Sequence, residues 1–188
     1  MNSCISVDHN IDRPNSFLLS ISAIVTKKIT QNTAAIIAKA VAGGGDDYEE
    51  IGARVTGITV CPCSGEMMSE RAKKKLASLG LGEQEVQEFL EEIPQAGHSQ
   101  RGHATLKIES KNSPEINVIE LIEMARDSMS AKIFNLAKRS DEDYMTYHAH
   151  LNAKFVEDCV RNVAKKVVDR FEDLDDEVIV TMIQSNDE

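Results

Sequence analysis

The chain has 188 residues, enough to bury one sizeable core, and 41% of them are hydrophobic, which excludes a disordered protein. A formal net charge of −10 argues against binding along a nucleic-acid backbone, and aromatic residues, at 4% with no Trp, are too few for a base-stacking platform. No apolar run approaches the roughly 20 residues of a membrane span, and the polar start lacks a signal-peptide core, so we expect a cytoplasmic protein.

Hydropathy patterns along the chain predict a single α+β lobe over residues 17–188, after a loose lead-in over 1–16. Alternating residues predict strands over 17–25, 51–60, 104–109 and 177–183. Helical spacing predicts helices over 31–41, 66–79, 83–93, 116–129, 132–138 and 153–173. Ser64 is the expected N-cap of the second helix, and residues 112–114 the expected turn. This order favours an antiparallel sheet with paired helices on one face.

Two cysteines follow the strand over 51–60 directly, as Cys61-Pro62-Cys63. A helix N-terminus lowers the pKa of a thiol, which makes the thiolate a better metal ligand or nucleophile. Because Pro62 and the helix start bend the chain, both thiols need not serve one ion. The alternative is two small buried hydrophobic residues at a strand end. Cys4 and Cys159 are expected to be structural.

A second polar segment, residues 97–103, contains His98 in a glycine-flanked loop, followed by Gln100 and Arg101. A loop histidine is commonly just solvated, but an arginine beside it suits bidentate phosphate binding. His98 is therefore a candidate ligand, and His103 a weaker one.

Carboxylates at two helix starts complete the candidate set. Glu142 follows Lys138 and Arg139; it is either an oxygen ligand or, with Asp141, a helix cap. Glu157 lies at the margin of a buried helix face, where it is either solvated or a general acid/base. His148 and His150 do not share a helix face and are not expected to be ligands.

Five segments, in this order, resemble the type IB GTP cyclohydrolases, most closely the C-terminal portion of their archaeal MptA branch: 56–64, 98–106, 128–130, 138–142 and 152–161. The resemblance implies a tunnelling fold (T-fold) assembled from several subunits, with active sites between them. It implies conversion of GTP and water to 7,8-dihydroneopterin 2′,3′-cyclic phosphate, formate and diphosphate, the first step of tetrahydromethanopterin or folate-type pterin biosynthesis.

The resemblance also implies roles for individual residues. Cys61, His98 and Glu142 would hold a divalent metal, ferrous iron in the archaeal branch and zinc or manganese in relatives. Glu157 would transfer protons, and Cys61 and Glu157 form the catalytic set. The substrate-binding residues would be Gln100, Arg101, Lys138 and Arg139. Ser140 replaces a proline of the family motif.

Family members are longer, with an upstream lobe and a tail that carries a further histidine ligand. We therefore expect activity when the missing segments complete the chain. The expected partner is a further copy in a homo-oligomer (dimer or tetramer) or an upstream lobe. We expect the chain to bind neither nucleic acid nor a membrane. The alternatives are a non-catalytic T-fold module that binds a purine or pterin or only assembles, and a structural zinc protein.

Overall fold

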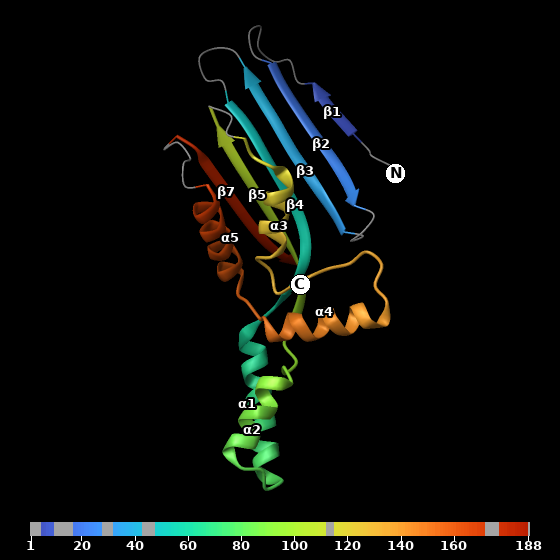
Figure 1. Ribbon diagram of the computed structural model, residues 1–188, viewed down its shortest axis with the longest axis vertical. Coiled ribbons are helices and arrows are strands. Elements are labelled where there is room, and N and C mark those ends of the chain that lie inside the picture. The colour runs from blue at the N-terminus through green and yellow to red at the C-terminus, as the bar shows by residue number, and fades with distance from the viewer. Residues whose placement is uncertain are drawn as a thin grey trace.

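The computed structural model describes residues 5–9, 17–27, 32–42, 48–111, 115–171 and 177–187 (Figure 1). The strands are β1 (Ile5–His9), β2 (Phe17–Lys27), β3 (Asn32–Ala42), β4 (Tyr48–Val60), β5 (Ser99–Ser110), β6 (Ala131–Lys132) and β7 (Ile179–Asp187). The helices are α1 (Pro62–Ser78), α2 (Glu83–Glu92), α3 (Val118–Arg126), α4 (Arg139–Leu151) and α5 (Val156–Arg170).

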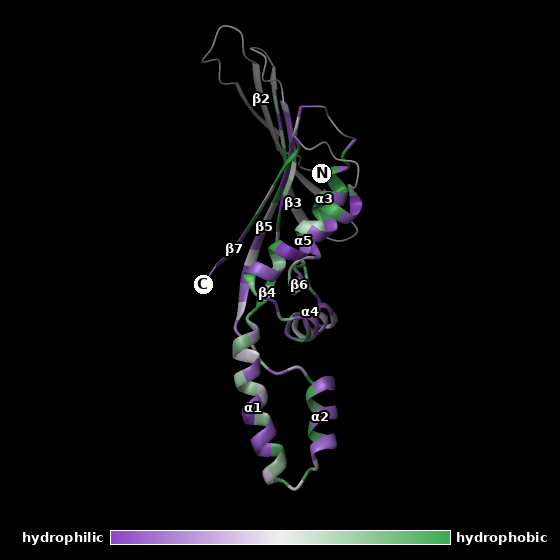
Figure 2. Cartoon of the chain, turned by 90° about the vertical axis from the view of Figure 1, so that its left-hand side faces the viewer, coloured by the Kyte–Doolittle hydropathy of each residue, from purple (hydrophilic) through white to green (hydrophobic). Residues whose placement is uncertain are grey.

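All strands belong to one antiparallel sheet in the order β1-β2-β3-β4-β5-β7, and the short β6 pairs with β4. Seen edge-on, α3, α4 and α5 lie on the same side of this sheet (Figure 2). The predicted α+β class, with an antiparallel sheet and helices on one face, is confirmed.

The core lies between the sheet and the helices α3 and α5. Leu106 and Ile108 of β5 point inward, as alternation predicted, and are at most 1% exposed. They pack with Leu121 of α3 and with Val163 of α5, both 0% exposed. Cys159 is equally buried, as expected of a structural cysteine, and burial raises the pKa of its thiol. The body of the protein thus has a closed apolar centre.

The helix predicted over 31–41 is wrong, because this segment forms β3. β3 pairs with β2 on one side and with β4 on the other, so its backbone groups are satisfied in a ladder. Its apolar residues fit both a helical and an alternating period, and Ile36 and Ile37 are β-branched residues that favour strands. Sheet pairing therefore decides a pattern that hydropathy leaves ambiguous.

Two smaller predictions also change. Residues 132–138 form no helix; Ala131–Lys132 make the strand β6 instead. Ile5–His9, within the expected lead-in, pair with β2 as β1. The turn expected at 112–114 lies outside the described residues. The other predicted helices and strands are present with shifted ends.

Helices α1 and α2 form a hairpin that extends away from the sheet, beyond the ends of β4 and β5 (Figure 1). Gly80, at φ 92°, occupies the left-handed conformation that closes α1, as expected of a glycine there. The hairpin buries little, since α1 has no buried residue and α2 has only Val86. Within the described residues, no helix combines the length and hydrophobicity that crossing a membrane requires.

Candidate functional site

The predicted site begins where two neighbouring strands reach the same end of the sheet. Val60, the last residue of β4, pairs with Ser99, the first residue of β5. The residues just beyond these ends, Cys61 and His98, are therefore neighbours, and the Cys61 N–H donates to the His98 carbonyl over 2.9 Å. Two segments 37 positions apart in the chain thus meet through the sheet register.

Ser64 joins the same two residues a second time. Its hydroxyl donates to the Cys61 carbonyl over 2.9 Å and accepts from the His98 N–H over 2.6 Å. The prediction that Ser64 is the N-cap of α1 is wrong. The N-cap is Cys61, and Pro62 takes the first helical position. Proline suits that position because its missing N–H would have no partner there. The helix therefore starts three residues earlier, which frees Ser64 to hold the loop.

Gly97 and His150 complete this corner. A Cβ on Gly97 would lie 2.5 Å from Cγ1 of Val60, so the close approach of the loop to the strand end requires glycine. Nε2 of His150 lies 3.3 Å from both the Gly97 carbonyl and the Ser99 hydroxyl, and its Nδ1 lies 2.8 Å from the Thr146 carbonyl. The C-terminal end of α4 thus rests on the loop that carries His98.

The two thiols differ in their surroundings. Cys61 is half-buried and Cys63 is exposed on the first turn of α1. Partial desolvation, and then the charge and hydrogen bond of the Cys61 thiol, raise the pKa of Cys63 above its ordinary value. The expectation that the helix N-terminus lowers thiol pKa is therefore wrong for Cys63.

Glu142, Lys138 and Arg139 lie at the opposite end of α4 from the Cys61–His98 corner. Glu142 precedes His150 by eight residues, which is about 12 Å along a helix, and it is exposed. Nowhere in the described ranges do three or more His, Cys, Asp or Glu side chains gather in an arrangement that could hold a metal ion. The structure brings Cys61 and His98 together, but within one chain it does not add Glu142.

The capping alternative holds for Asp141. Its carboxylate accepts from the Lys138 N–H over 2.8 Å, which satisfies a free donor at the start of α4. Lys138 and Arg139 are both exposed.

The remaining predicted residues surround the same end of the sheet. Oε1 of Gln100 on β5 accepts from Nδ2 of Asn186 on β7 over 3.2 Å. Arg101 is exposed and stands opposite Asp187 of β7 in the register. Glu157 lies exposed in the first turn of α5.

Comparison with known proteins identifies the family. The family described as Type I GTP cyclohydrolase folE2 matches residues 8–188. The chain belongs to this family. Among its relatives, GTP cyclohydrolase MptA of Halobacterium salinarum is 61% identical over 160 residues, which are 85% of this chain and 51% of that protein. GTP cyclohydrolase MptA of Haloarcula marismortui is 59% identical over 167 residues, 89% of this chain and 54% of that protein. The chain spans about half the length of these relatives.

A more distant relative also carries the name MptA, and the match covers similar fractions of both chains. GTP cyclohydrolase MptA 2 of Methanocella arvoryzae is 40% identical over 166 residues, covering 87% of this chain and 54% of that protein.

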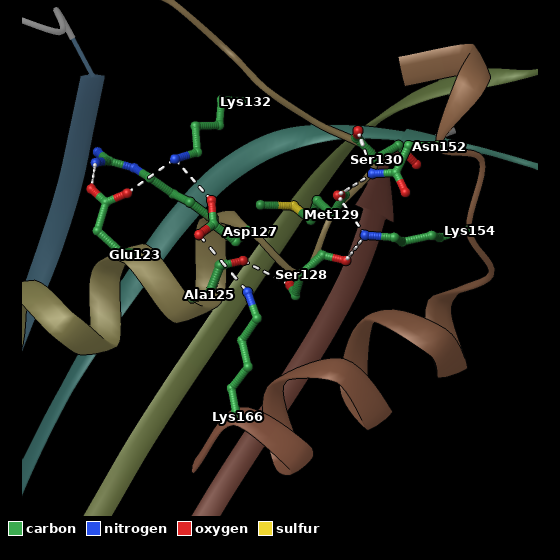
Figure 3. Close-up of polar contacts among 11 residues, drawn as sticks. Glu123, Ala125, Asp127, Ser128, Met129, Ser130, Lys132, Asn152, Lys154 and Lys166 are labelled. Atoms are coloured by element: carbon green, nitrogen blue, oxygen red, sulfur yellow. Dashed lines mark hydrogen bonds and ion pairs between the residues drawn. The ribbon is translucent and has the colours of Figure 1, made fainter. Parts of the chain in front are cut away.

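In this cyclohydrolase-family chain, polar residues that the sequence did not single out hold the strand end before Cys61. Figure 3 shows two of them, Asn152 and Lys154, bonded to the segment 128–130. The Ser130 hydroxyl accepts from the Val60 N–H over 3.1 Å, and the Val60 carbonyl accepts from the Lys154 N–H over 3.0 Å. Nδ2 of Asn152 donates to the Ser130 carbonyl over 2.9 Å. The N–H and the carbonyl of Val60, the residue before Cys61, are therefore both held by residues outside the sheet.

Lys154 adds its side chain to this arrangement. Its Nζ donates to the carbonyls of Ser128 and Met129, each over 3.2 Å. Burial lowers the pKa of its ammonium group below the ordinary 10.5. Ser128 is 0% exposed, and its hydroxyl donates to the Ala125 carbonyl over 2.7 Å. The segments 128–130 and 152–161 belonged to the resemblance, but hydropathy gives no signal for a lysine that binds carbonyl groups.

The contacts of His103 link strands, which agrees with its being a weaker candidate ligand than His98. Its Nδ1 lies 3.1 Å from the Thr56 hydroxyl on β4, and its Nε2 lies 3.0 Å from a carboxylate oxygen of Asp187 on β7. The ring therefore links three adjacent strands.

Proposed function

We propose that this chain is the C-terminal part of a type IB, metal-dependent GTP cyclohydrolase of the MptA type. In this proposal it forms 7,8-dihydroneopterin 2′,3′-cyclic phosphate, formate and diphosphate from GTP and water once the remaining segments complete it. The observation that carries the proposal is the doubly hydrogen-bonded contact between Cys61 and His98 in a chain of this family. The names of its relatives support the same substrate.

The donor set at this corner suits half of a metal site. A thiolate sulfur and an imidazole nitrogen are ligands that zinc and ferrous iron accept, and both belong to segments that the backbone holds in place. Glu142, exposed at the far end of its helix, would have to reach the ion from a second copy of the chain or from a rearranged α4. A bound divalent ion would supply an activated water for hydrolysis of the purine ring.

The residues of the chain itself would then orient the substrate and move protons. Arg101, exposed at the strand end, can pair with phosphate oxygens, and the exposed cations Lys138 and Arg139 can do the same from an adjacent copy. Gln100 can hydrogen-bond the base beside them. The exposed carboxyl of Glu157 is free to exchange protons with solvent and with substrate.

The test is GTP-dependent formate release under anaerobic conditions with ferrous iron. The chain is assayed alone and together with the part of the Haloarcula marismortui relative that lies outside the match. We expect little turnover alone and formate release from the mixture. Cys61→Ala and His98→Ala should each reduce turnover by about a hundredfold or more, because loss of a ligand exceeds the roughly 10–100-fold cost of losing its supporting contacts.

Cys63→Ala is the matched control, since it removes the neighbouring exposed thiol. It should retain most of the turnover and most of the bound iron, whereas Cys61→Ala should lose both. A mixture that binds GTP tightly but releases no formate after iron loading would favour the non-catalytic binding module instead. Full activity of Cys61→Ala would refute the site assignment.

A further inference from the structure

The α1–α2 hairpin carries an uneven distribution of charge. Between residues 71 and 75, α1 holds four cations, whereas α2 holds five glutamates and no cation. The salt bridge of α1 is internal, between Lys73 and Glu70, and within the described residues no ion pair joins α1 to α2. One helix of the hairpin is therefore basic towards its tip and the other is acidic, in a chain whose formal net charge is −10.

The hairpin also exposes apolar side chains, and they gather on one side. At 100° per residue, Met68, Arg71, Lys75 and Leu79 form one stripe along α1, about 90° from the intermediate-burial positions that face α2. The corresponding stripe on α2 contains Glu85, Phe89 and Glu92, which lie about 80–140° from the α1-facing positions Val86 and Leu90. Because the helices run antiparallel (Figure 2), both stripes turn to the same broad side of the hairpin. We call these seven residues the mixed side.

The apolar members of the mixed side are poorly covered. Met68 is 42% exposed, Leu79 is 63% exposed and Phe89 is 39% exposed. The opposite broad side has only charged and polar residues and Ala77, among them Glu70, Lys73 and Glu83. Apart from Met67 on the outer edge of α1 and Ile93 after the end of α2, the exposed large apolar residues of the hairpin lie on this one side, where its basic and acidic stripes also run in parallel.

We propose that the mixed side is an interface between two copies of this chain, which pair their hairpins into an antiparallel four-helix bundle. A twofold axis parallel to the hairpin places α1 of each copy over α2 of the other, so each basic helix meets an acidic one. Counted from the turn at Gly80, Lys75 and Glu85 lie at about the same height along the axis, and Arg71 and Glu92 lie at heights within about 5 Å of each other. The same rotation brings Met68, Leu79 and Phe89 of both copies into the centre.

Self-complementarity favours a second copy over an unrelated partner. A partner with one sign of charge would match one stripe and repel the other, whereas the same hairpin turned by 180° matches both. The inference does not depend on the proposed catalysis, because no predicted site residue belongs to the mixed side.

Charge reversal provides the first test, by sedimentation equilibrium of the full chain at low salt. One variant carries Arg71→Glu; the other carries Glu92→Lys. Glu85 is left unchanged because its carboxylate accepts from the Gly82 N–H over 2.8 Å and so caps α2. Each variant alone should associate about tenfold more weakly, since like charges then face each other across the interface. An equimolar mixture of the two should recover the affinity, because every reversed pair is again opposite in sign.

Lys74→Glu is the matched control, with the same charge change as Arg71→Glu on the same helix but off the mixed side. It should leave association unchanged, and circular dichroism should show equal helicity in all variants. Equal weakening by the control, or no recovery in the mixture, would overturn the proposal.

Cross-linking separates this contact from association through other surfaces. Unlabelled and ¹⁵N-labelled chains are mixed and treated with a zero-length carbodiimide, and the linked peptides are identified by mass spectrometry. Mixed-isotope links between Lys75 and Glu85 are expected. Links found only within one isotope would overturn the interface, even if the protein is oligomeric.

Discussion

The sheet with its two covering helices and the protruding hairpin bury apolar surface to very different extents. In the body, Leu106, Leu121 and Val163 are 0% exposed. In the hairpin, Val86 at 8% is the only buried residue, and Leu79 is 63% exposed. The body can therefore hold itself together, while the hairpin depends on helix propensity and on what covers it. Cys61 stands at the junction, directly after β4 and before the first residue of α1.

The largest effect expected from this difference is the loss of a body side chain. Leu106→Ala should lower the free energy of unfolding by about 2–5 kcal/mol, because the close-packed surroundings of a fully buried leucine cannot collapse into the cavity. Val86→Ala removes less volume from a site with few neighbours and should cost about 1 kcal/mol. Urea denaturation followed by circular dichroism measures both. Similar costs for the two substitutions would mean that the hairpin is packed as well as the body.

A smaller effect is expected at the connection between body and site. Lys154→Met should lower the free energy of unfolding by about 1–3 kcal/mol, because the carbonyls of Ser128 and Met129 lose a donor where water has little access. Lys154→Arg is the control, since it restores a cationic donor of similar length. A methionine variant as stable as the parent would show that these carbonyls find other donors.

The pH dependence of the same variant has a definite sign. Because burial lowers the pKa of Lys154 below 10.5, the unfolded chain holds this proton over a pH range in which the folded chain has released it. Stability from this group therefore increases as pH rises from the lowered pKa towards 10.5. The stability difference between the parent and Lys154→Met should widen over that alkaline window. A difference that narrows there would contradict the buried, desolvated lysine.

Sequence patterns predicted a helix correctly where the hydrophobic period continues over a long segment or where a residue that ends a helix follows it. The long apolar stripe of α5 and the glycine at φ 92° after α1 are such cases. It failed at β3, where Ala34 and Ala38, four residues apart, fit both a helical and an alternating period and only pairing with β2 and β4 decides. It also misplaced the start of α1, because a proline in the first helical position was a stronger signal than a serine two residues later.

For the site, the sequence identified side-chain types but not the contacts that hold them. Cys61 and His98 were predicted together and do lie together, whereas Glu142 is separated from them by the length of α4. Ser64, His150 and Lys154 act through backbone carbonyls and amides, which no pattern of side-chain types reveals. Their roles depend on sheet register, and register becomes visible only when the strands are paired.

The smallest and most discriminating prediction compares two glycines on either side of the junction. Gly97→Ala should lower the free energy of unfolding by about 1 kcal/mol, because its Cβ would lie 2.5 Å from Val60, a 1% exposed residue that cannot move aside. Gly65→Ala should instead raise it by about 0.5–1 kcal/mol, since nothing lies within 4 Å of a Cβ there and alanine favours the helix. Both substitutions add one methyl group. A difference between the two variants in thermal unfolding therefore reports the room around each glycine and not the chemistry of the change. If the two shifts share a sign, the tight contact of the His98 loop with the end of β4 does not exist in solution, and the support for the Cys61–His98 corner goes with it.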